Sequence, residues 1–410
     1  GQDPEWLRRR AGFRVARHVS RRAFPVPSPG FAGLTADVDG ETLRDWRGAG
    51  TLVPATADVA LDRGDEGSPP YGWHWGNRGS VTSAAIEKPH RSGWTPILEA
   101  EFDLAYTPLM ELAVGEGLAI WCTLDLEGRV GSEPAADLLA SRLLEHARAV
   151  PARPRAAQTV YLGGAPGEAL LRNVGLRFTR TFRTDRAPGL LVVAADAPLT
   201  RVDLDRRLAA GWRLLLLPRP AGDLPFAFRA AGTTGFAGSL DVPAWPECRG
   251  LSASDLRLRA PVAATVLIDG PEVGAGGLLG RVTSRFGSAI LIQLTPDQLE
   301  ADRLTYLRYS SWRLTRTLAQ LLANLGGEFE VDRRSLDWGR KAAGRPASRQ
   351  DSWMALIGRP ARPESAVRQA PPDAESGGGD EGGGGPPDFY VPGLRTDFVL
   401  GDDPYRYYRW

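Results

Sequence analysis

Apolar residues recur along this chain in short unbroken runs and in helical spacings, and the two patterns alternate between residues 157 and 330. The runs TVYLGG (159–164), GLLVVAAD (189–196) and WRLLLLP (212–218) have the length of buried strands. PGEALLRNVGL and DLDRRLAAG, which lie between them, place apolar residues at helical intervals. Strands that alternate with helices predict a parallel sheet covered on both faces.

Two further segments share a layout of apolar run, turn and helix. The first is GEGLAIWCTLDLEG (115–128) followed by EPAADLLASRLLEHARA, and the second is FGSAILIQLTPDQLE (286–300) followed by RLTYLRYSSWRLTRTLAQLLANLG. We therefore expect two related three-layer α/β modules with parallel sheets, at 1–150 and 157–330. The first module lacks the earlier strand–helix units of the second, so we expect it to be truncated at its N-terminus.

The patterns end near residue 330. Residues 331–387 contain ESGGGDEGGGGPPD and are expected to be irregular and to include a Gly-rich linker. Residues 388–410 are short and rich in aromatic residues, which is typical of a segment that docks on another surface.

Charge and composition exclude several classes of protein. The 410 residues include 50 basic and 49 acidic side chains, so no nucleic-acid partner is expected. No apolar run approaches the roughly 20 residues that span a bilayer, so no membrane crossing is expected. The chain starts at Gly1 without a visible signal peptide, which leaves the cellular compartment open.

Motifs for chemistry are incomplete. Cys122 has no base placed beside it, and no histidine lies in the module that contains Cys248. The histidines show no metal-ligand spacing. LGGAPGEA (162–169) lacks the full phosphate-binding spacing and is better explained as a tight turn, while VGAGGLLG (273–280) is expected to be a loop. We therefore expect no catalytic residue, cofactor or metal.

One aromatic stretch, YGWHWGNRGSV (71–81), is a candidate carbohydrate contact, because tryptophans stack on sugar rings. The candidate residues for such a binding module are Trp73, His74, Trp75, Asn77, Arg78 and Trp94. Packing at a sheet edge is the favoured alternative, since large aromatic residues mostly contribute to packing. A small hydrolase site in the same loops would use His74, Glu87, His90 and Glu101.

Three stretches resemble the C-terminal region of large bacterial proteins. They are YGWHWGNRGSVTSAAIEKPHRSGWTPILEAEFDLAYTPLMEL (71–112), the GEGLAIWCTLDLEGRVGSEPAADLL that follows it, and the closing GDDPYRYYRW. These proteins are related to β-galactosidases of glycoside hydrolase family 2. The resemblance implies catalytic barrel and sandwich domains upstream. It also implies flavodoxin-like modules here, similar to class I glutamine amidotransferases.

Neither the nucleophilic Cys with its His and Glu partners nor the barrel glutamates have counterparts in this sequence. The resemblance therefore implies a non-catalytic accessory or assembly region that acts in carbohydrate metabolism. Its candidate partners are the upstream glycosidase domains of the same parent chain, a carbohydrate and a second copy of the chain.

Overall fold

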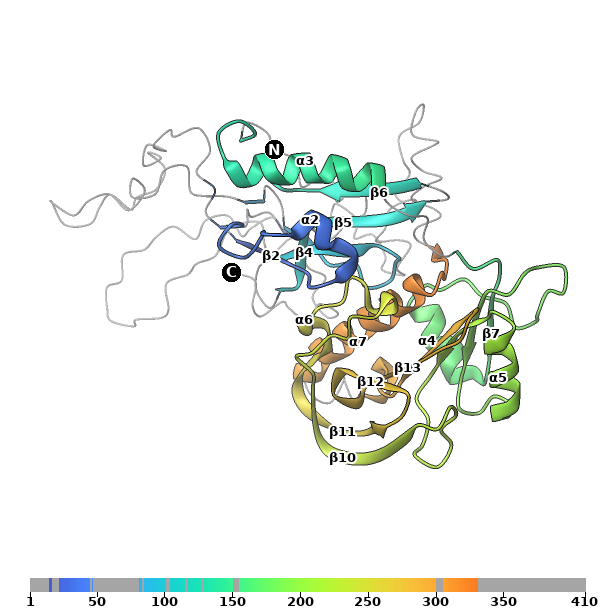
Figure 1. Ribbon diagram of the computed structural model, residues 1–410. Coiled ribbons are helices and arrows are strands. Elements are labelled where there is room, and N and C mark those ends of the chain that lie inside the picture. The colour runs from blue at the N-terminus through green and yellow to red at the C-terminus, as the bar shows by residue number, and fades with distance from the viewer. Residues whose placement is uncertain are drawn as a thin grey trace, which may run out of the picture.

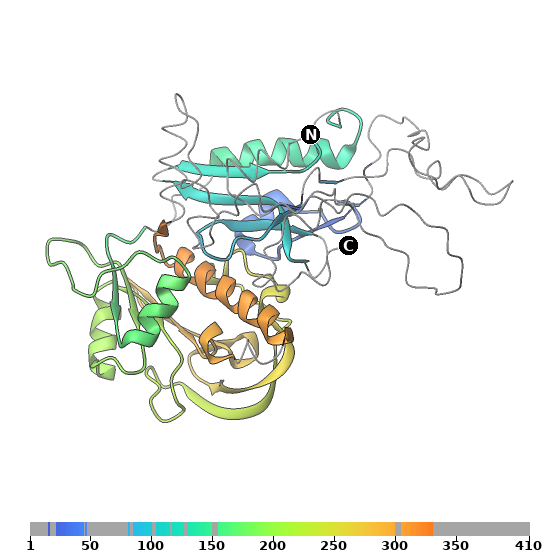
Figure 2. The same cartoon turned by 180° about the vertical axis from the view of Figure 1, so that it is seen from behind.

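The computed structural model describes residues 15–16, 22–44, 46, 81–82, 85–100, 104–114, 117–126, 129–149, 155–299 and 305–330. The predicted linker (331–387) and docking segment (388–410) lie outside the described residues. The described helices and strands form two units, each built around a sheet (Figures 1 and 2).

The first unit is an antiparallel sheet in the order β1-β3-β5-β4-β2, with β6 also paired to β5. Its strands are β1 (Val15–Ala16), β2 (Ala23–Pro25), β3 (Ala85–Glu87), β4 (Thr95–Ala100), β5 (Tyr106–Val114) and β6 (Gly117–Cys122). The prediction of a parallel sheet is wrong for this unit, since every strand pairing described in it is antiparallel. Only residues 115–116 separate β5 from β6, and parallel neighbours need a crossover of a dozen residues or more.

Helices cover one face of this first sheet. This layer contains the 3₁₀ turn η2 (Pro29–Phe31), α2 (Ala32–Thr35) and α3 (Pro134–Ala149), and α3 runs alongside β6 (Figure 1). Ala135, Ala136 and Leu139 of α3 pack with Phe31 and Leu34 in a buried core.

The second unit contains a mixed sheet of α/β type in the order β12-β13-β14-β9-β8-β7. The expected strands and helices are confirmed: β7 (Thr159–Leu162), α4 (Ala165–Asn173), β8 (Leu190–Val193), α5 (Arg201–Ala209), β9 (Arg213–Leu216) and β14 (Ser288–Ile292). These four strands are parallel, while β12 (Glu272–Gly274) and β13 (Leu279–Thr283) continue the sheet antiparallel. The expected loop at 273–280 therefore holds the end of β12, the 3₁₀ turn η6 (Ala275–Gly277) and the start of β13.

One more segment extends the parallel part of the sheet. Thr179 bridges Val160 of β7 in parallel, so residue 179 lies on the outer edge and β8 on the inner side. The parallel order is thus 179, β7, β8, β9, β14. After β7 the chain moves toward the outer edge of the sheet, and after β8 it moves toward the centre, so α4 and α5 cover opposite faces of the sheet. Leu170 and Leu171 of α4 pack in the core on one face, and Leu204 and Leu208 of α5 pack in the core on the other.

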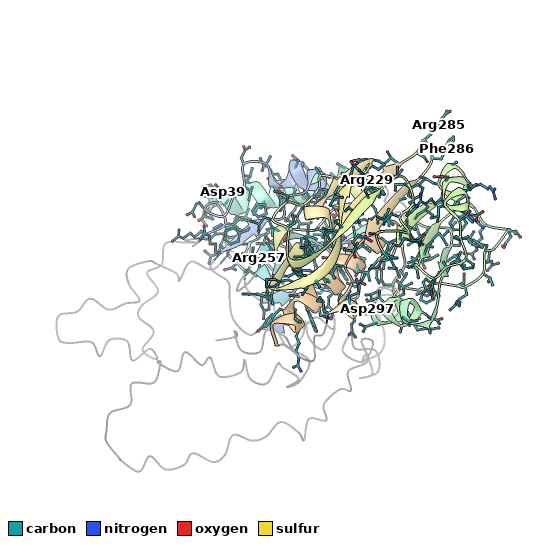
Figure 3. The ribbon with its side chains drawn as sticks, turned by 90° about the horizontal axis from the view of Figure 1, so that it is seen from below. Asp39, Arg229, Arg257, Arg285, Phe286 and Asp297 are labelled. Atoms are coloured by element: carbon teal, nitrogen blue, oxygen red, sulfur yellow. The ribbon has the colours of Figure 1, made fainter. Side chains whose placement is uncertain are left out.

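A long hairpin that the apolar pattern did not reveal wraps the second unit. It consists of β10 (Arg229–Gly238) and β11 (Arg257–Asp269), whose pairing contains several register shifts. Figure 3 shows Arg229 and Arg257 on this hairpin, and the register places them at opposite ends of it. Between the two strands lie η5 (Pro246–Cys248) and α6 (Ala253–Leu256), while η7 (Pro296–Gln298) follows β14.

The helix α7 (Thr305–Asn324) lies on the side of the second unit that faces the first (Figures 1 and 2). Its leucines, among them Leu314, Leu318 and Leu321, pack into the core of the second unit. Polar residues on its other side, including Arg316 and Gln320, are also buried. Both sides of one helix are thus covered, by the second sheet and by the first unit.

Candidate functional site

The carboxyl edge of the parallel strands is the first place to look for a site. In open α/β sheets, ligands bind outside the carboxyl ends of the strands, where the strand order reverses. Here the order reverses between β7 and β8, because residue 179 lies on one side of β7 and β8 on the other. The loops after β7, β8 and β9 are therefore the relevant ones.

The loop after β7 is filled by side chains of the chain itself. A Cβ on Gly163, whose φ is +148°, would lie 2.5 Å from the hydroxyl of Tyr161 and 2.5 Å from the Cβ of Ala194. The backbone N–H of Gly164 donates to Asp196 Oδ1 over 3.1 Å, and the Tyr161 hydroxyl donates to the Gly164 carbonyl over 2.8 Å. A carboxylate thus occupies the start of α4, where an anionic ligand would otherwise bind. The interpretation of 162–169 as a turn that needs glycine is confirmed.

Arg219 closes the next part of the edge. It follows β9, is only 5% exposed, and donates from Nη2 to the Ala194 carbonyl over 2.9 Å and from Nη1 to Asp223 over 3.0 Å. Its backbone N–H donates to Gln293 Oε1 over 3.1 Å, and Gln293 Nε2 donates back to the Arg219 carbonyl over 3.2 Å. The ends of β8, β9 and β14 are therefore tied together by internal hydrogen bonds.

Neither cysteine lies at this edge. Cys248 is in η5 and 2% exposed, and burial raises its pKa to about 12. Cys122 is in β6 of the first unit, and burial raises its pKa to about 11. Both thiols are therefore protonated near neutral pH, and the protonated thiol is a poor nucleophile.

No family model, curated protein or solved structure matches this chain. Its function has to be inferred from its own geometry.

The second concentration of polar groups is the buried junction between the units. Lys88, which follows β3, donates to Glu99 of β4 over 2.5 Å and to the Ser254 hydroxyl of the second unit over 3.2 Å. Glu99 also accepts from the Ser252 hydroxyl over 2.7 Å. Asp255 lies 3.8 Å from Lys88 Nζ and forms an ion pair with Arg316 of α7.

This junction continues along α7. Gln320 Nε2 donates to the Thr95 hydroxyl over 3.0 Å, which links α7 to β4. Gly250 has φ of +81°, and a Cβ there would lie 2.3 Å from Thr95 Cγ2. The backbone of the second unit can therefore approach β4 this closely only because residue 250 is glycine.

A buried carboxylate, that of Glu111, joins α3 and the second unit at the end of the junction nearest α3. Glu111 of β5 has no exposed surface and accepts from His146 Nε2 of α3 over 2.7 Å and from Arg249 of the second unit over 2.7 Å. Arg249 also lies over the ring of Phe31, 4.3 Å from its centroid. Three segments distant in sequence thus meet at one carboxylate.

The candidate carbohydrate residues are mostly outside the described chain. This holds for Trp73, His74, Trp75, Asn77 and Arg78, and for Glu101 of the alternative hydrolase site, so their roles stay predictions. The described candidates are Trp94, Glu87 and His90. Trp94 is 6% exposed and offers little ring surface to a sugar.

Glu87 and His90 are also buried. The ring of His90 lies against Trp312 of α7, with 3.8 Å between centroids. The structure therefore places these two residues beside the junction, within a packed environment.

Two further properties concern only the described part of the chain. Among its residues, no three His, Cys, Asp or Glu side chains are grouped closely enough to hold a metal ion. No helix in the same part is both long and apolar enough to cross a bilayer.

The residues that sequence reasoning missed are those of the junction. Lys88, Ser92 and Thr95 are polar residues that the sequence analysis did not single out, yet all three are buried. The available signal was the second stripe on α7, where Arg313, Arg316 and Gln320 recur at helical spacing opposite the leucines.

Proposed function

We propose that this chain is a non-catalytic accessory and assembly region of a β-galactosidase-like glycoside hydrolase, acting in carbohydrate metabolism. In this proposal, the second unit is a flavodoxin-like module related to class I glutamine amidotransferases that has lost its chemistry. Its partners are the glycosidase domains of the same parent protein.

The strand order supports the flavodoxin-like assignment of the second unit. Counted along the chain, β7, residue 179, β8, β9 and β14 are first to fifth, and their spatial order is 2-1-3-4-5. This is the order of flavodoxin-like sheets. The first unit has an antiparallel sheet without this strand order, so the flavodoxin-like assignment applies to the second unit alone.

The closed carboxyl edge is the observation that carries the proposal. Asp196 occupies the turn at α4, and the Gln293 side chain bonds to the backbone N–H and carbonyl of Arg219. The Arg219 side chain is bound to Asp223 and to the Ala194 carbonyl, so most polar groups of this edge already have partners within the chain. Cys248 is buried and Cys122 is half-buried, and both thiols have raised pKa values, so neither resembles an activated nucleophile.

The junction supports the assembly part of the proposal. The Lys88–Glu99 pair lies in the first unit, and it is bound to the second unit by hydrogen bonds with the hydroxyl groups of Ser252 and Ser254. These buried contacts hold the two units in one arrangement, which suits a region that presents fixed surfaces to neighbouring domains.

Turnover measurements on the purified chain test the proposal. An aryl-β-galactoside and glutamine should both be hydrolysed no faster than in buffer. A Cys122→Ala, Cys248→Ala double variant serves as the control for traces of contaminating enzyme. Turnover of either substrate by the wild-type chain that disappears in the double variant would contradict a non-catalytic role. Galactoside turnover would also contradict a non-catalytic role if it remains with the chain when the chain is purified until its specific activity no longer changes.

A further inference from the structure

An arginine-rich surface lies on the outer edge of the second sheet, beside the turn that follows β7. We call it the arginine edge, and it comprises Arg172 at the end of α4 and Arg177, Arg180, Arg183 and Arg186 in the segment that runs past β7. Residues 179–188 of this segment are all exposed apart from Phe182, which is partly buried. The bridge between Thr179 and Val160 fixes the segment to the sheet.

Carboxylates are too few to neutralise this edge. Glu168 is shared by Arg172 and Arg180, with N–O distances of 2.7 and 2.6 Å. Asp185 pairs with Arg183 alone, over 2.9 Å. Arg186 donates to a backbone carbonyl, that of Ala157. Arg177 shares Glu328 with Arg155, at the same edge.

The arginines also keep donors available to a ligand. The exposed side-chain fractions are 70% for Arg172, 51% for Arg180 and 53% for Arg183. Arg172 uses Nε and Nη2 on Glu168, and Arg183 uses Nε and Nη2 on Asp185. Within the described chain, the Nη1 groups of these two arginines make no hydrogen bond.

Internal contacts hold two of the guanidinium groups in place before any ligand arrives. Arg180 donates from Nη2 to the Gly163 carbonyl over 2.5 Å and lies over the Tyr161 ring. Arg172 lies over the ring of Phe178, 5.7 Å from its centroid. Such preorganisation lowers the entropy lost on binding.

We propose that the arginine edge binds an anionic glycan whose sugars carry carboxylates. This inference rests on the proposed role in carbohydrate metabolism. Guanidinium groups bind carboxylates in a two-pronged geometry that suits uronate sugars. Arg177, Arg180 and Arg183 are three residues apart, so neighbours are at most about 10 Å apart at their Cα atoms.

Charge complementarity favours a glycan over nucleic acid as the occupant. Phosphates follow one another every 3.4 Å along each strand of duplex DNA, and affinity depends on neutralising many of them. Glu168, Asp185 and Glu328 lie among the arginines and would repel so dense a row of charge. A glycan with one carboxylate per sugar can bind the arginines while its neutral hydroxyl groups face those acids.

Calorimetric titration of the full chain with oligogalacturonates tests the inference, with neutral galactan oligomers, a sulfated galactan, poly-glutamate and single-stranded DNA as comparisons. We expect the oligogalacturonate to bind and the neutral oligomers not to bind. Arg180→Ala combined with Arg183→Ala should weaken this binding by at least about tenfold, because it removes two guanidinium groups that donate charge-assisted hydrogen bonds to carboxylates. Arg201→Ala combined with Arg206→Ala on α5 is the matched control and should leave affinity unchanged.

Arg180 also supports the turn after β7, so a second variant guards against misfolding. Thr181→Glu adds a negative charge to the arginine edge without removing an arginine, and it should weaken oligogalacturonate binding in a correctly folded chain. Unchanged binding in both edge variants, or equal loss in the α5 control, would overturn the inference. Absence of oligogalacturonate binding would do the same, as would tighter binding of DNA or poly-glutamate.

Tighter binding of the sulfated galactan would overturn the choice of carboxylate as the recognised group. These binding results are separate from the turnover assay. A catalytically active chain could still bind the glycan at this edge, and an inactive chain could fail to bind it.

Discussion

Replacing Lys88 by Met should change how the stability of the protein depends on pH. Burial, reinforced by the positive charge of Arg316, lowers the pKa of Lys88 from 10.5 to about 7. In the unfolded chain the amine keeps an ordinary lysine pKa. Between about pH 7 and pH 10.5, the unfolded chain therefore binds one proton more than the folded chain at this site.

The sign and size of the effect follow from proton linkage. Stability rises with pH wherever the unfolded state binds more protons, and one full proton gives about 1.4 kcal/mol per pH unit. The wild-type protein should therefore gain roughly 2–3 kcal/mol between about pH 7.5 and pH 9.5 from Lys88 alone. The gain ends above the unfolded pKa of the amine, and below the folded pKa of about 7 the site contributes no slope.

Urea unfolding at a series of pH values measures this contribution. In Lys88→Met, Glu99 keeps the hydroxyl donors of Ser252 and Ser254, and the difference in slope from wild type reports the amine. Arg206→Met removes an exposed cation from α5 and should leave the wild-type slope unchanged. Parallel stability curves for wild type and Lys88→Met across this range would refute the reasoning.

Two further substitutions address the junction and the thiols. Gly250→Ala should lower the free energy of unfolding by about 1–3 kcal/mol, because residue 250 has a left-handed backbone and its Cβ would meet Thr95. Gly222 has open space around it, so Gly222→Ala should change the free energy of unfolding by less than about 0.5 kcal/mol. Urea titration compares the two variants, and equal effects would contradict the close approach at the junction. In a Cys122→Ser variant, the remaining Cys248 should react with a disulfide reagent at pH 8 only after denaturation, since burial keeps its thiol protonated, and rapid labelling of the folded protein would show that it is accessible.

The second unit was the part most accessible to prediction. Parallel strands buried on both faces appear as unbroken apolar runs, and Leu190–Val193 and Arg213–Leu216 lie within the runs found in the sequence. The edge position of residue 179 was not visible, because a single bridge leaves no run of apolar residues.

The local pattern of the first unit fits two topologies, a parallel strand–helix unit and an antiparallel hairpin. β6 leads toward a helix, as a strand of a parallel unit would, and the short connection at 115–116 alone shows that it belongs to a hairpin. A turn of two residues between apolar strands is the stronger signal.

The polar sites depended on tertiary structure. Arg313, Arg316 and Gln320 form a stripe that would face water on an ordinary surface helix. It is buried because Arg313 and Arg316 pack on Arg257 and Asp255 of the second unit and Gln320 on Thr95 of the first. The arginine edge was likewise hidden by the even balance of charge along the whole chain, because the fold gathers five of its arginines at one sheet edge.

Because α7 lies between the two units, the contacts that it makes with β4 can form only after α7 has been synthesised. Thr95 and Gln320, which join β4 to α7, are separated by 225 residues. At 5–20 residues per second, the ribosome adds that length in about 10–45 seconds. During this interval, β4 and β5 have been made but the helix that completes their junction has not. Conditions that slow translation would therefore lengthen the time in which β4 has been made and its contact with Gln320 of α7 cannot yet form.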